Sequence, residues 1–137
     1  MSAVMTREVY DDLKAEDPRL LARMEKSPKY KAVIVAFRQE DKADAVEAAR
    51  RYQSGENFTI LGKSLSFVQV VEIAMSKATY QVKNPEFEAH SQKFPMLYAR
   101  AAEAWTVLNL VQEGLAEQGV EFSKTTDSLR AIVEAAL

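Results

Sequence analysis

The run YKAVIVAF, residues 30–37, constrains the fold of this chain more than any other stretch. Its last six residues are all apolar, which would leave a helix without a polar side. Three of them in a row are β-branched and favour a pleated surface: Val33, Ile34 and Val35. A short, bounded apolar run is typical of a strand covered on both faces. We therefore predict a buried strand over 30–37, with a single helix over 28–53 as the alternative.

Start signals for helices surround this run. Thr6 is a candidate N-cap for a first short helix, and Asp17-Pro18 opens a second one, because proline suits the first helical position. Asp41 is predicted to cap an amphipathic helix that ends at Ser54-Gly55.

The middle of the chain predicts further strands. Residues 58–61 are expected to form a strand that turns at Gly62-Lys63. Residues 65–73 fit either the second strand of a hairpin or a helix whose inward side chains are Phe67, Val70, Val71 and Ala74. Short strands are also expected at 79–82 and 120–122, and a short helix at Asn84-Pro85.

A long helix from Pro95 to about Gln118 follows, and Asp127 is expected to cap a last helix. Apolar residues of the long helix alternate spacings of four and three, the rhythm of a packed seam. Core burial and self-association both explain such a seam. The residues predicted for a partner or dimer interface are Leu97, Ala101, Ala104, Trp105, Leu108, Val111 and Leu115.

The length of 137 residues favours one domain, residues 1–137, with its own core. We expect an α/β (α+β) fold, in which a small sheet packs with several helices, including the long one near 95–118. An all-α bundle is the alternative, and it follows if residues 28–53 are one helix.

Charge is unevenly distributed in a chain with 18 basic and 20 acidic residues. Residues 101–137 are acidic, whereas residues 19–31 are basic. Such asymmetry can steer a partner or a second copy of the chain. The basic segment is also a candidate nucleic-acid contact, expected to be weak because no aromatic platform lies beside it: Arg19, Arg23, Lys26, Lys29 and Lys31.

The order AVIVAF, ADAVEAARRY and FTILGKSLSFVQV resembles the second half of an RNA recognition motif. The resemblance implies a sheet whose RNA-stacking strand carries aromatic residues at alternate positions. Ala32 and Ile34 stand where two of these aromatic residues would be, and only Phe37 matches the pattern.

Sequence signatures of catalysis are few. The chain has no cysteine and one histidine, His90. Gly62-Lys63-Ser64 resembles the end of a phosphate-binding loop, but Asn57 stands where that loop needs its first glycine. We predict no enzyme, no cofactor and no metal; an enzyme of unrecognised type is the third hypothesis.

Taken together, these patterns favour a cytoplasmic, non-catalytic protein-binding or assembly protein. It would form a homodimer and act as an adaptor or assembly cofactor in a larger complex, of which a phage or viral complex is one kind. An RNA-binding protein that uses residues 19–31 is the second hypothesis. No apolar run is long enough for a membrane span, and no membrane partner is expected.

Overall fold

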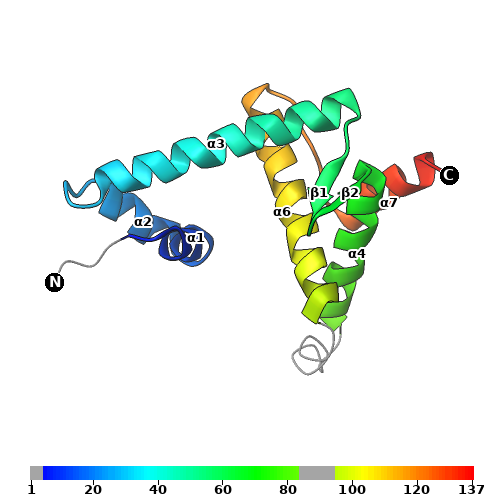
Figure 1. Ribbon diagram of the computed structural model, residues 1–137, viewed down its shortest axis with the longest axis horizontal. Helices are drawn as coiled ribbons and strands as arrows, with labels where there is room; N and C mark the ends of the chain where they lie inside the picture. Colours follow the sequence, from blue (N-terminus) through cyan, green and yellow to red (C-terminus); the bar gives the residue numbers. More distant parts are fainter. Residues whose placement is uncertain (1–4, 84–94) are drawn as a thin grey trace. The chain divides into compact units, whose positions relative to one another are not determined.

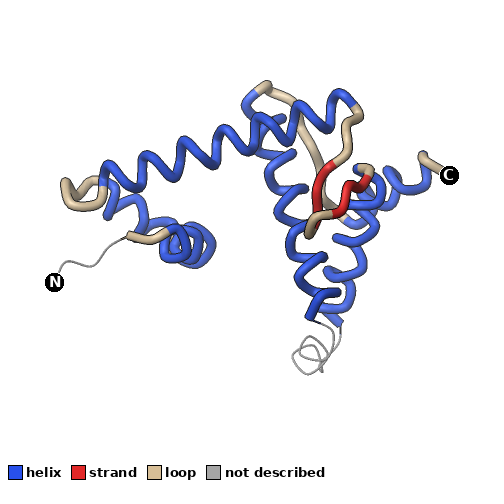
Figure 2. Tube along the Cα trace, viewed as in Figure 1, coloured by secondary structure: helices blue, strands red, loops and turns tan. Residues whose placement is uncertain are grey.

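The computed structural model describes residues 5–83 and 95–137 and divides into two compact units (Figure 1). Unit 1 comprises residues up to Asp44, and unit 2 comprises Ala45–Leu137. Helices dominate the described chain, and its strands form one antiparallel hairpin (Figure 2). The fold is therefore helix-dominated with one small sheet. The expectation of a single domain over residues 1–137 stays a prediction.

Unit 1 contains α1 (Arg7–Glu16), α2 (Pro18–Glu25) and the first part of α3 (Lys31–Ser54). The Thr6 side chain accepts a hydrogen bond from the Val9 amide at 3.2 Å and so caps α1. Asp17 caps α2 through the Leu20 amide at 3.1 Å. Both predicted helix starts are confirmed, because side-chain oxygens at these positions satisfy amides that a helix leaves unpaired.

The strand predicted at 30–37 is wrong, because residues from Lys31 onward belong to α3. One side of this stretch is buried in the core of unit 1, where Ile34 is fully enclosed and the Phe37 ring lies 5.2 Å from that of Tyr10. The other side carries exposed alanines, Ala32 and Ala36. Alanine is the best helix former and needs no burial, so the helix tolerates a second side that is not polar.

A helix at this position also overturns the likeness to an RNA recognition motif. The strand that would stack RNA bases is the first part of α3. Residues 28–53 therefore follow the alternative prediction of one helix, although the helix begins at Lys31, after a turn closed by the Lys31 amide on the Ser27 carbonyl at 3.0 Å.

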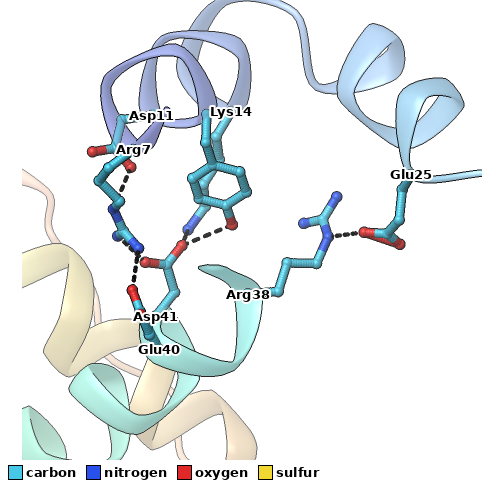
Figure 3. A network of polar contacts seen from close by, with 8 residues as sticks. Arg7, Asp11, Lys14, Glu25, Arg38, Glu40 and Asp41 are labelled. Atoms are coloured by element: carbon cyan, nitrogen blue, oxygen red, sulfur yellow. Dashed lines mark hydrogen bonds and ion pairs between the residues drawn. The ribbon is translucent and has the colours of Figure 1, made fainter. Parts of the chain in front are cut away.

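The prediction that Asp41 caps a helix is wrong, because Asp41 lies inside α3. Its carboxylate joins α3 to α1 (Figure 3). It accepts hydrogen bonds from the Tyr10 hydroxyl at 2.9 Å, from Lys14 Nζ at 3.0 Å and from the Arg7 guanidinium. Partial burial opposes ionisation, but the bonds from Lys14, Arg7 and Tyr10 outweigh it and lower the pKa of Asp41. Burial, helped by the bond to Asp41, raises the pKa of Tyr10 to about 12.

Unit 2 contains the rest of α3, the strands β1 (Phe58–Ile60) and β2 (Lys63–Leu65), and the helices α4 (Phe67–Lys83), α6 (Pro95–Glu117) and α7 (Thr126–Ala135). In the hairpin Phe58 pairs with Leu65 and Ile60 with Lys63. Leu61 and Gly62 both have positive φ, 47° and 79°, as a tight hairpin turn requires. The predicted strand is confirmed but is one residue shorter than expected. The predicted turn is confirmed at Gly62 and lies one residue earlier, at Leu61-Gly62, because Lys63 already begins β2.

Residues 65–73 combine both predicted alternatives, since Leu65 ends β2 and Phe67 begins α4. Val70, Val71 and Ala74 are buried, as the helical alternative requires. The core of unit 2 forms where α4 and α6 lie side by side (Figure 1).

The strands predicted at 79–82 and 120–122 are both wrong. The first range belongs to α4, and the second is an extended segment outside the sheet. Thr125, rather than Asp127, caps α7, because its hydroxyl accepts the Ser128 amide at 3.2 Å. The predicted helix at Asn84-Pro85 and the side chain of His90 lie outside the described residues.

Gly114 allows α6 to approach α3 more closely than any larger residue would. A Cβ atom built at this buried position would lie 2.1 Å from the Ala45 carbonyl oxygen and 2.7 Å from the Ala49 Cβ. Both neighbours belong to the same unit, and one of them is backbone, which cannot rotate away. The absence of a side chain at position 114 is therefore a packing requirement.

The first prediction concerns this contact. Gly114→Ala should lower the free energy of unfolding by about 1–3 kcal/mol, because the added methyl group must displace α3 backbone. Helix propensity alone predicts the opposite sign, a gain of about 1 kcal/mol. Urea unfolding followed by circular dichroism measures the change. The reverse exchange at an exposed position of the same helix, Ala102→Gly, is the control. A stabilised Gly114→Ala variant would contradict the contact.

The second prediction concerns Asp41. Because folding lowers its pKa, the carboxylate stabilises unit 1 above its unfolded pKa of about 4, and this stabilisation is lost as pH falls through the lower folded value. Asp41→Asn should cost about 1–2 kcal/mol at pH 7 and progressively less below pH 4. Urea unfolding at pH 7 and pH 3 measures both differences. Asp12→Asn, an exposed position on α1, should have little effect at either pH.

Candidate functional site

The seam predicted as an interface lies mainly within the core of unit 2. Four of its seven residues belong to that core: Ala104, Leu108, Val111 and Leu115. Ala101 is a fifth buried residue of the seam. Trp105 is half-buried and donates from Nε1 to the Ala74 carbonyl at 2.7 Å, whereas Leu97 is 48% exposed. The core of one chain therefore explains the seam. A dimer contact through the five buried residues stays a prediction and would require that core to open.

The third prediction separates core from interface. Leu108→Ala should lower the free energy of unfolding by about 2–5 kcal/mol, because it leaves a cavity in a fully buried position. Leu97→Ala, at the exposed end of the seam, should cost far less. If the seam is core, the loss at Leu108 is the same at every protein concentration. A loss that grows on dilution would indicate a dimer interface instead.

The predicted basic residues lie on unit 1, and all five are exposed. Arg19 and Arg23 belong to α2, and Lys26 is its C-cap residue, so helical spacing of four and three places the three on one face. Lys29 lies in the following turn, with its ammonium 5.2 Å from the centre of the Tyr30 ring, and Lys31 begins α3. We call these five residues the cationic surface.

Within the described chain, no carboxylate forms an ion pair with any residue of the cationic surface. Glu25 is the one acidic residue of the segment 19–31, and it binds the Arg38 guanidinium instead (Figure 3). This hydrogen bond raises the pKa of Arg38. Arg7 and Lys14 are likewise held by Asp41. Arg7, Lys14 and Arg38 are thus neutralised locally, but the cationic surface is not.

Unit 2 carries a surface groove of about 610 Å³ where α6 ends. Its walls combine apolar side chains, including the 44% exposed Val120, with two exposed carboxylates, Glu113 and Glu121. Neither carboxylate has an ion-pair partner among the residues described. We call this feature the acidic groove, and it is lined by Gln112, Glu113, Ala116, Val120, Glu121, Phe122, Ser123, Lys124 and Thr125.

The wall formed by residues 120–125 is held by specific contacts. The Phe122 ring is buried, 5.6 Å from that of Tyr52 and 6.0 Å from that of Phe67. The backbone carbonyl of Phe122 accepts a hydrogen bond from Gln112 Nε2 at 2.9 Å. The Lys124 ammonium donates to Asn109 Oδ1, so this cation has a polar partner on α6. The groove is therefore built into the packing of unit 2.

Sequence reasoning found the cationic surface but missed the acidic groove. The residues of segment 120–122 were expected to pair in a sheet, where they would not line a groove. An excess of acidic residues near the C-terminal end was the available signal, but it did not show which carboxylates would share a surface with apolar side chains.

Features typical of catalysis are not brought together in the described ranges. Lys63 and Ser64 of the candidate phosphate loop form β2 of the hairpin. No cluster of three or more potential metal ligands occurs within residues 5–83 and 95–137. The shifted pKa of Glu47, lowered to about 2, comes from its hydrogen bond to Arg50 on an exposed helix surface.

Comparisons with models of known protein families, with curated proteins and with solved structures found no match to this chain. Within the part of the chain that the structure describes, no helix is long and apolar enough to cross a bilayer. The interpretation of function therefore rests on the two surfaces themselves.

Proposed function

We propose that this protein is a non-catalytic binding and assembly protein, and that the cationic surface docks it onto an acidic surface of a protein partner. One observation carries the proposal. The five exposed cations have no described carboxylate partner, whereas Arg7, Lys14 and Arg38 of the same unit are all held by acidic side chains.

The physical argument concerns what unneutralised charge does at a surface. A carboxylate near these cations would cancel their field, and the nearest one in sequence, Glu25, is bound to Arg38. A cluster of one sign attracts the opposite sign over about 8–10 Å at physiological salt. It raises the rate of association and selects acidic partners over basic ones. Arginine is also among the residues that contribute most at protein interfaces.

Nucleic acid is the second candidate, because Arg19, Arg23 and Lys26 share one helix face and could follow a phosphate backbone. Two features favour a protein partner. The whole chain is slightly acidic, with a formal net charge of −2, which weakens attraction to a polyanion. The one aromatic ring beside the cations, Tyr30, is half-buried and carries the Lys29 ammonium over it, so it offers no open platform for a base.

The fourth prediction tests the cationic surface with defined probes. A fluorescent glutamate-rich peptide should bind at low salt, and Arg19→Gln/Arg23→Gln should weaken this binding about fivefold, as expected for two exposed charge pairs. Fluorescence anisotropy at two salt concentrations measures the change. The matched control, Lys63→Gln/Arg130→Gln, removes two positive charges from unit 2 and should bind as the natural protein does.

A single-stranded oligonucleotide of equal charge distinguishes the two candidates. Under the proposed function it binds no better than the peptide. Tight binding of the oligonucleotide that resists salt would contradict the protein-partner proposal. Equal peptide binding by the variant and its control would show that the cationic surface is not the docking site.

A further inference from the structure

The acidic groove and the cationic surface are complementary in charge, and one chain carries both. We propose that the acidic groove receives the cationic surface of a second copy of this chain. The inference rests on the proposed function only because it uses the same cationic surface, and it identifies the acidic partner as the protein itself.

Charge complementarity is the first argument. Glu113 and Glu121 are exposed and have no described cation partner, just as the cationic surface has no described carboxylate partner. Lys124, the one cation in the groove lining, is bound to Asn109. The Asn109 amide is neutral, so Lys124 keeps its charge, but the carboxylates of Glu113 and Glu121 outnumber it and leave the groove acidic. This is the sign of charge that the cationic surface attracts. Opposed charges of this kind fix the orientation of an encounter and accelerate it.

The apolar wall of the groove is the second argument. Ala116 and Val120 are exposed within it, so a docked helix would cover apolar area in addition to pairing charges. Leu20 of α2 lies between Arg19 and Arg23 in the sequence and is only half-buried, which leaves part of its side chain for such a contact. Interfaces generally combine an apolar centre with a polar rim, and both are present here.

The two surfaces belong to different parts of the chain, so the contact would be heterologous. In a pair joined by one such contact, one copy keeps a free groove and the other keeps a free cationic surface. Association therefore continues into open chains or closes into a ring. A contact limited to one helix and one groove is small, and it should be weak and sensitive to salt.

The fifth prediction uses two complementary variants. The cation variant is Arg19→Gln/Arg23→Gln, and the groove variant is Glu113→Gln/Glu121→Gln. The natural protein should self-associate at low salt in sedimentation velocity experiments and dissociate as salt rises. Each variant alone should associate about fivefold or more weakly, because every contact it makes has lost two charges on one side.

Mixing the variants is the decisive step. An equimolar mixture contains one intact groove, on the cation variant, and one intact cationic surface, on the groove variant. It should form a heterodimer of twice 15.4 kDa with the affinity of the natural contact, and it should grow no further. Two controls that remove equal charge elsewhere should associate as the natural protein does: Lys63→Gln/Arg130→Gln and Glu8→Gln/Glu16→Gln.

Two outcomes would overturn the inference. A symmetric dimer that survives in both variants and is not changed by mixing would place self-association on another surface. A natural protein that stays monomeric at all concentrations and salts would exclude the contact altogether. In that second case, peptide binding that still depends on Arg19 and Arg23 would leave the proposed function standing, so the two failures are distinguishable.

Discussion

Both units form around α3, because each of them buries one side of its own part of this helix. In unit 1 the buried side is centred on Ile34. In unit 2 it includes the small residues Ala45 and Ala49, which meet Gly114 of α6. Large side chains enclose the first contact, whereas the second depends on the absence of side-chain volume.

The ion pairs that α3 forms with α1 and α2 determine which charges of unit 1 stay unpaired. On α3, Asp41 forms ion pairs with Arg7 and Lys14 of α1. Arg38, also on α3, forms an ion pair with Glu25 of α2. Because Glu25 is engaged there, the cationic surface keeps its charge. Each exposed ion pair is worth little to stability. These ion pairs matter here because they leave the cationic surface unpaired within the described residues and available to a partner.

Local signals in the sequence predicted local structure well. Side-chain caps at Thr6 and Asp17 and the positive-φ turn at Gly62 depend on interactions within a few residues, and all are confirmed. The seam of the long helix was also correct as a pattern, since Leu108 and Val111 are buried. Periodicity shows that one face of a helix is covered. It does not show whether the same chain or another one covers it.

The sequence was sufficient to predict the starts of α1 and α2, the hairpin turn, the long helix from Pro95 and the basic residues at 19–31, because each depends on nearest neighbours or on charge that has no buried role. The helical conformation of residues 31–37, by contrast, follows from tertiary packing. Their β-branched side chains favour a strand locally, but the burial of Ile34 and Phe37 outweighs a propensity of about 1 kcal/mol. The acidic groove likewise required the fold, because Glu113 and Glu121 share one surface only after the contacts of Phe122 hold its segment against α6.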